Sequence, residues 1–243
     1  MALPQKALRE LKARVALANR ILANEGLADY HGHVSARIPG TNRFLIKPVL
    51  KPLAEVTARD ILIVDIDAYK KMIPEQRKRF DTRAGVIAEA RPPRETIIHA
   101  AAYEARPDVN GVVHTHQLFA AAFGLARRPI LPVHNTAGAL YPGTPILDNS
   151  RLLITGEDGK QMVEALGQAS ALLLRGHGVV LVAPSVEEVT VNTIYLERAA
   201  KVQLIASLLG HEGGLSAEDS AVHTQNIRRR AEHAFAYFAS LLR

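Results

Sequence analysis

Two histidines end a short apolar run, Gly111-Val112-Val113-His114-Thr115-His116. In a β-strand, side chains two residues apart lie on the same face, so both imidazoles would point the same way. Imidazole is the commonest metal ligand in proteins, and two that converge from one strand form part of a metal-site geometry. The same pattern also fits a surface pair or a pair of hydrogen-bonded core histidines. The interpretation as a catalytic metal site therefore requires a third ligand and a proton-transfer group elsewhere in the chain.

A third imidazole is offered by His177, which lies between two glycines in Arg175-Gly176-His177-Gly178. Apolar stretches that read as buried strands, 171–174 and 179–182, flank it. Glycine lets the backbone pass close to a ligand, and hairpin turns more often use Asn-Gly or Asp-Gly. His177 is therefore a candidate ligand, with a hydrogen-bonded turn histidine as the alternative. Three neutral imidazoles and an open position are typical of a catalytic divalent metal.

The candidate acid or base is Glu95, near the start of a helix expected over 94–105 after two prolines. A carboxylate there could equally serve only the helix dipole. A nearby dication would hold it ionised when no substrate is bound. His99, one turn later on the same face, is a further ligand or, more commonly, a supporting or packing residue. The roles of His31 and His134 stay open, as does that of His99.

The surrounding pattern is mixed α/β, with no visible domain boundary, and predicts a single domain over 1–243. Helices are expected at 8–22, 94–105, 118–123, 159–166, 185–209 and 224–242. Strands are expected at 34–38, 43–47, 61–66, 85–88, 109–116, 171–174 and 179–182, and a strand-like segment at 129–134. Exposed or Gly- and Pro-rich loops are expected at 67–83 and 135–149.

Composition limits the class of protein. The chain has 243 residues, 48% of them hydrophobic, a net charge of +6 and no cysteine. Thiolate sites and disulfides are thereby excluded. The basic residues form no stripe with interleaved aromatics, so we expect no nucleic-acid partner and a small-molecule carboxylate substrate instead. No apolar run approaches the length that spans a bilayer, and the N-terminus reads as a charged amphipathic helix, so we expect a cytoplasmic protein without a membrane partner.

Taken together, the motifs resemble the class II aldolase/adducin family over roughly residues 8–209. The motifs that carry the resemblance are Gly32-His33-Val34-Ser35-Ala36-Arg37, Phe44-Leu45-Ile46, Glu95, His114-Thr115-His116 and Arg175-Gly176-His177-Gly178. The resemblance implies one α/β/α domain with a central, mainly antiparallel sheet. It implies His114, His116 and His177 as metal ligands, and Glu95 as the carboxylate that occupies the metal or moves protons. It also implies a homotetramer with sites at subunit interfaces.

Two positions depart from the sugar-phosphate aldolases of that family. Those enzymes carry a Ser-Ser pair before the glutamate and an Asn in the glycine-rich loop, where this chain has Pro93-Arg94 and His33. Hydroxyl and amide donors suit phosphate, whereas a guanidinium can hold a carboxylate bidentately. The stretch 91–95 resembles the family's decarboxylase branch, whose members act on dihydroxyphthalate or a carboxylated hydroxymuconic semialdehyde in aromatic catabolism.

The sequence therefore predicts a carbon–carbon lyase, a metal-dependent decarboxylase of a 3,4-dihydroxyphthalate-type acid working through a metal-stabilised enolate. Arg94 and His33 would position carboxylates, and Glu95 or a nearby imidazole would protonate the carbanion. Zinc is the first expectation for the metal, and manganese, iron or cobalt would also suit three imidazoles. The alternatives are an aldolase cleaving a sugar-acid or sugar-phosphate-like substrate, a non-catalytic adducin-like interaction module, and iron-dependent oxygenation.

Overall fold

A central sheet organises the computed structural model, which describes residues 3–71 and 91–242. Seven strands lie in the order β3-β2-β1-β4-β7-β6-β5. Neighbours are antiparallel except β5 and β6, which are parallel. The strands are β1 (His33–Arg37), β2 (Arg43–Ile46), β3 (Leu62–Asp65), β4 (Gly111–Thr115), β5 (Ile146–Leu147), β6 (Ala171–Leu174) and β7 (Gly178–Ala183). The expectation of a mainly antiparallel sheet is confirmed.

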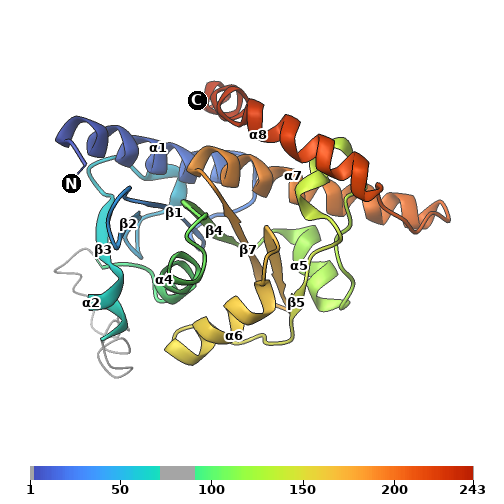
Figure 1. The fold of residues 1–243 in the computed structure, drawn as a ribbon, viewed down its shortest axis with the longest axis horizontal. Coiled ribbons are helices and arrows are strands. Elements are labelled where there is room, and N and C mark those ends of the chain that lie inside the picture. Colours follow the sequence, from blue (N-terminus) through green and yellow to red (C-terminus); the bar gives the residue numbers. More distant parts are fainter. Residues whose placement is uncertain (1–2, 72–90, 243) are drawn as a thin grey trace.

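Helices cover both faces of this sheet. The helices in the described part of the chain are α1 (Gln5–Asn24), η1 (Leu53–Glu55), α2 (Ile66–Lys70), α4 (Thr96–Ala105), α5 (Leu118–Leu125), η2 (Asn135–Leu140), α6 (Gly156–Leu166), α7 (Val186–Leu208) and α8 (Ala217–Ser240), where η marks a 3-10 helix. Figure 1 shows α1, α7 and α8 on one side of the strands and α4 and α6 on the other. The fold is thus α/β/α, as the resemblance implied.

The alternation of side chains along the central strands produces two cores. Val112 of β4 packs with α4 and α6, whereas Val113 packs with α1 and α7. In β7, Val180 faces the first of these cores and Leu181 the second. Because the side-chain period of a strand is two, His114 shares the face of Val112. The histidine motif therefore points toward the side of the sheet that α4 covers.

The predicted loop over 67–83 is wrong at its beginning, where α2 forms. The Asp65 carboxylate caps this short helix by accepting the N–H of Ala68 at 3.1 Å, while Ile66 and Tyr69 are buried. Capping by Asp and burial of one face stabilise this short helix, which the charged sequence does not predict. The rest of that segment, and the strand expected at 85–88, lie outside the described residues.

The strand-like segment expected at 129–134 is also wrong. Its two prolines cannot donate to a ladder, and two of its other N–H groups bond to side chains instead. Ile130 donates to the hydroxyl of Thr144 at 2.8 Å, and Leu131 donates to the Gln203 side chain on α7 at 2.8 Å. The loop expected at 135–149 contains η2 and β5.

The last helix begins at Ala217, seven residues before the expected start at 224. The hydroxyl of Ser216 accepts the N–H of Asp219 at 3.1 Å, which caps the first turn. This N-cap explains why α8 extends further toward the N-terminus than its apolar periodicity indicated.

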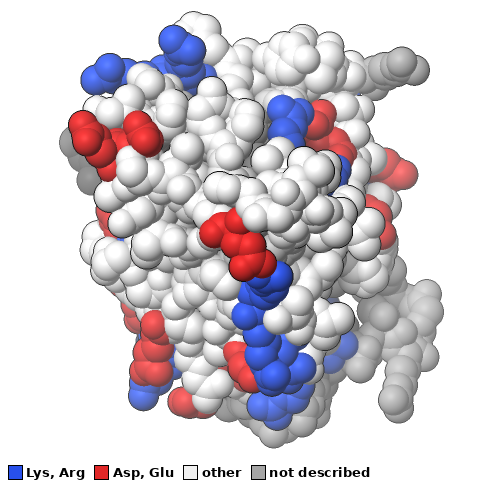
Figure 2. All heavy atoms as spheres, turned by 90° about the vertical axis from the view of Figure 1, so that its right-hand side faces the viewer, with Lys and Arg blue, Asp and Glu red and all other residues white. Residues whose placement is uncertain are grey.

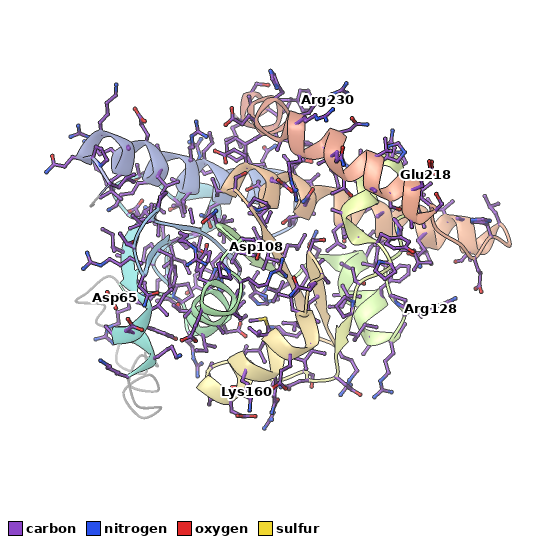
Figure 3. The ribbon with its side chains drawn as sticks, in the orientation of Figure 1. Asp65, Asp108, Arg128, Lys160, Glu218 and Arg230 are labelled. Carbon is purple, nitrogen blue, oxygen red and sulfur yellow. The ribbon has the colours of Figure 1, made fainter. Side chains whose placement is uncertain are left out.

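Most charged residues lie on the outside of this architecture, and Lys47 and Glu95 are among the buried exceptions. The side chains of Lys160 on α6 and Arg230 on α8 project on opposite sides of the sheet (Figure 3). The face seen in Figure 2 is mostly uncharged, and several of its basic groups adjoin acidic ones. Among the described helices, none combines the length and apolar character needed to cross a bilayer.

Candidate metal centre

Four side chains from three separate elements converge at one end of β4. Glu95, His114, His116 and His177 each offer one ligand atom, and these atoms lie within 4.8 Å of one another. Oε2 of Glu95 is 3.4 Å from Nε2 of His114 and 3.5 Å from Nε2 of His177. The structure therefore brings together the three histidines and the glutamate that the sequence singled out.

Antiparallel pairing of β4 with β7 places these groups side by side. His114 lies opposite Val180 in this register, and His177 occupies the turn that leads from β6 into β7, where its N–H donates to Leu174 O at 3.0 Å. Gly178 makes the approach possible. A Cβ at this position would overlap the carbonyl of Thr115 and lie 2.8 Å from Cδ2 of His116.

The ring nitrogens of this cluster are ready to coordinate. Nδ1 of His114 is 2.9 Å from the carbonyl oxygen of Val179. A carbonyl can only accept, so Nδ1 carries the proton and Nε2 keeps its lone pair. That Nε2 atom and both ring nitrogens of His177 are buried with no hydrogen-bond partner among the described residues. Buried polar atoms without partners are rare, and here the Nε2 atoms of His114 and His177 both face Oε2 of Glu95, as ligands of one divalent cation would.

Glu95 links the cluster to the loop before α6. It is the N-cap residue of α4 but makes no capping bond. Its Oε1 atom instead accepts the N–H of Leu153 at 2.9 Å, which leaves Oε2 facing the histidines. Burial alone would raise the pKa of this carboxyl, but His114 and His177 outweigh burial and hold the pKa well below its usual range. Glu95 is therefore a carboxylate at neutral pH.

Two neighbouring imidazoles, those of His116 and His33, are neutral at neutral pH. Burial, aided by His114 and His177, lowers the pKa of His116 to about 3. Burial also lowers the pKa of His33 well below its usual value, with help from His99 and His114. Neutral imidazole is the form that binds metal ions. The donor set of three imidazoles and one carboxylate thus fits a divalent cation.

A cavity of about 280 Å³ opens beside the cluster, and Glu95 and His116 form part of its wall. His33 and Arg94 line it as well, so both predicted substrate-positioning residues face the same space. Arg94 is exposed and makes no hydrogen bond or ion pair with another described residue. The cavity is large enough for a small molecule and has one wall of potential metal ligands.

Lys47 lines this cavity too, and the sequence interpretation did not single it out. Its side chain is only 1% exposed. Its ammonium group donates to the carbonyls of Pro48, Val49 and Lys51 at 3.2, 3.4 and 3.0 Å, with no carboxylate partner in the described chain. Burial lowers its pKa to about 8. The available signal is a lysine directly after the apolar run 44–46, at the end of the strand that the sequence predicts over 43–47.

The remaining histidines differ in their positions. The His31 side chain is 71% exposed, with its ring centroid 6.1 Å from that of His116. His134 is exposed and accepts the N–H of Thr136 at 3.3 Å. His99 is fully buried and contacts His33, with Nε2 of His99 2.6 Å from Nδ1 of His33. None of the three belongs to the metal-competent group formed by the described residues.

The sequence of this chain is similar to those of known proteins. Residues 13–204 match the model of the class II aldolase and adducin N-terminal domain. The chain is 32% identical over 205 residues to a 3,4-dihydroxyphthalate decarboxylase of Arthrobacter keyseri, covering 81% of this chain and 78% of that protein. It is 33% identical over 217 residues to the 3,4-dihydroxyphthalate decarboxylase of Terrabacter sp. strain DBF63, covering 85% and 86%.

A solved structure shows the same fold. The L-fuculose 1-phosphate aldolase from Glaciozyma antarctica PI12 matches 100% of this chain and 92% of its own, with a TM-score of 0.78 and 22% sequence identity. The family model, the decarboxylase relatives and this fold agree with the resemblance drawn from the motifs. The chain belongs to the class II aldolase and adducin N-terminal domain family.

Proposed function

We propose that this protein is a divalent-metal-dependent decarboxylase of a hydroxylated aromatic or hydroxymuconic carboxylic acid, with a 3,4-dihydroxyphthalate-type substrate. The observation that carries the proposal is the position of two cations, Lys47 and Arg94, on the wall of the cavity that Glu95 and His116 also line. A substrate with two carboxylates complements both the cations and a metal. The names of the relatives at about one-third identity support the same class of reaction.

The metal would be held by His114, His116 and His177. When bound, a divalent cation supplies Lewis-acid stabilisation for the electron pair left on carbon when the carboxylate departs. Zinc is our first choice, and manganese, iron or cobalt also suit imidazole ligands.

The chain's own residues would bind the acid and move the proton. The Arg94 guanidinium can hold one carboxylate bidentately, while the Lys47 ammonium attracts the second. His33 donates a hydrogen bond from the same wall. Glu95, a carboxylate in the free protein, takes a proton through Oε2 from a substrate hydroxyl and returns it to the carbon that has lost carbon dioxide.

Metal analysis of the purified protein, followed by a screen of dihydroxyaryl carboxylates, tests this proposal. We expect stoichiometric divalent metal and release of carbon dioxide. Aldehyde release from a sugar acid or sugar phosphate would favour the aldolase alternative, and oxygen consumption would favour iron-dependent oxygenation. A metal-free, inactive protein would favour a non-catalytic adducin-like module.

Three expectations about the whole protein complete the proposal: a single domain, a homotetramer and a cytoplasmic location. Light scattering on the purified protein tests the tetramer, for which a mass of four chains is expected and a monomer would contradict us. Cell fractionation tests the location.

A further inference from the structure

A buried row of four polar side chains leads from the cavity into the core on the α4 side of the sheet. Nδ1 of His33 lies 2.6 Å from Nε2 of His99. Nδ1 of His99 lies 2.6 Å from Oγ of Ser35, and that hydroxyl lies 2.7 Å from the phenolic oxygen of Tyr103. All four side chains are at most 4% exposed. The two middle residues, His99 and Ser35, therefore each have a hydrogen-bond partner on either side.

The inner end of the row fixes the direction of its hydrogen bonds. Among the described residues, the hydroxyl of Tyr103 has Ser35 as its hydrogen-bond partner. If the phenol accepted from Ser35, its own buried proton would therefore have no acceptor among the described residues. Because an unmade buried hydrogen bond is costly, the phenol donates to Ser35.

The donor and acceptor of each remaining hydrogen bond in the row follow in turn. Ser35, having accepted from the phenol, donates to Nδ1 of His99. The proton of neutral His99 must then be on Nε2, which donates to Nδ1 of His33. Nδ1 of His33 is thereby an acceptor, so the proton of this neutral imidazole is on Nε2. Since Nδ1 is engaged inward, Nε2 is the nitrogen left for a ligand in the cavity.

We propose that Tyr103, Ser35 and His99 are positioning residues that hold His33 as its Nε2–H tautomer, a neutral donor for a carboxylate oxygen of the substrate. This proposal rests on the proposed function for the identity of the ligand, but the tautomer rests on the row alone. His33 also lies outside the metal-competent group, although its ring centroid lies 5.2 Å from that of His114. A protonated Nε2 offers no lone pair to a metal.

Neutron diffraction from a deuterated crystal tests the tautomer directly. We expect deuterium on Nε2 of both His33 and His99, and none on Nδ1 of either ring. Deuterium on Nδ1 of His33 would overturn the proposal, whatever reaction the enzyme performs. Conversely, a wild-type protein that releases no carbon dioxide would overturn the proposed function without changing the deuterium positions, so the two failures are distinguishable.

Substitutions test the consequence for substrate binding. Ser35→Ala removes the donor to His99, whereas Ser35→Thr keeps a hydroxyl. Ser220→Ala is the matched control, because Ser220 is a buried serine whose hydroxyl has no partner in the described structure. For Ser35→Ala we expect a KM about tenfold higher, as losing one hydrogen bond to a charged group implies, with kcat and metal content nearly unchanged. Ser35→Thr should restore KM.

An unchanged KM in Ser35→Ala would contradict the positioning role. A loss of metal together with kcat would do so as well, because it would show that Ser35 serves only the structure of the centre. Tyr103→Phe provides a second variant, expected to raise KM less than Ser35→Ala because Ser35 can still donate to His99.

Discussion

His33 and His114 lie directly opposite each other on β1 and β4, yet their Nδ1 atoms have partners of opposite kinds. Nδ1 of His114 donates to the carbonyl of Val179, 2.9 Å away. Nδ1 of His33 faces Nε2 of His99 at 2.6 Å. Two imidazoles at neighbouring positions of one sheet are thus suited to different tasks, one to coordination and the other to donation.

Replacing His116 with Ala should remove both metal and turnover. It takes one of three imidazoles from the proposed centre, and we expect turnover to fall by more than about a hundredfold. Elemental analysis and a carbon dioxide assay measure the two effects. His233→Ala, an exposed substitution on α8, should change neither. An active His116→Ala protein without metal would refute the proposed centre.

Glu95→Gln should leave the fold intact but slow the reaction. The Gln carbonyl can still accept the N–H of Leu153, so we expect little change in Tm. Loss of the proton-carrying carboxylate should lower kcat about 10²- to 10⁴-fold. Glu104→Gln, on the exposed part of the same helix, is the control. Normal kcat in Glu95→Gln would remove Glu95 from the mechanism.

Lys47 predicts a pH dependence of substrate binding. Burial lowers its pKa to about 8, so the side chain is charged below that pH and neutral above it. The KM for a dicarboxylate should therefore be flat below pH 8 and rise by up to about tenfold per pH unit above it. Lys47→Met should have a high KM at every pH. Lys51→Met, whose amine pairs with Asp60 instead, should keep the wild-type profile.

Arg94→Ala should weaken binding of carboxylate substrates without loss of metal. A bidentate guanidinium–carboxylate pair contributes about 1.5–3 kcal/mol, so KM should rise roughly 10- to 150-fold. Arg94→Lys should recover only part of this, because an ammonium cannot bind in the same fork geometry. Arg59→Ala, another exposed arginine, serves as the control. Equal KM values for Arg94→Ala and wild type would exclude Arg94 from substrate binding.

Gly178→Ala should disturb the centre through packing alone. The added Cβ would overlap the carbonyl of Thr115 and press on the ring of His116. We expect a loss of about 1–3 kcal/mol in the free energy of unfolding, together with weaker metal binding. Gly176→Asn is a fair comparison, since its Cβ would have no neighbour closer than 3.8 Å and Asn tolerates positive φ. Denaturant unfolding would show no loss in Gly178→Ala if this contact were harmless.

The elements that sequence predicted well are those with strong periodicity. Residues 171–174 and 179–182 are buried on both faces, so their apolar runs identify strands whatever their partners. His177 could be placed in a turn because glycines flank it. The candidate site followed from these two features and from the spacing of His114 and His116.

The features that escaped prediction depend on contacts between distant segments. The segment 129–134 looks like a strand locally, but the N–H groups of Ile130 and Leu131 bond to the side chains of Thr144 and Gln203. Lys47 acquires its low pKa from burial by tertiary packing, and His99 is a partner of His33 only because β1 lies beside α4. None of these pairings has a local sequence pattern.

The pairing of β4 with β7 has a consequence for folding. Atoms of His114 and Val179, 65 residues apart in sequence, meet in this pairing, and Glu95 arrives from yet another element. An ion held by His114, His116 and His177 would bind the native chain more tightly than the unfolded one, because only folding brings these side chains together. Mass action then adds a stabilisation that grows with the logarithm of free ion concentration. The concentration of that ion would therefore set the fraction of chains that are folded and resist proteolysis. It would do so in addition to setting the turnover rate of each folded chain.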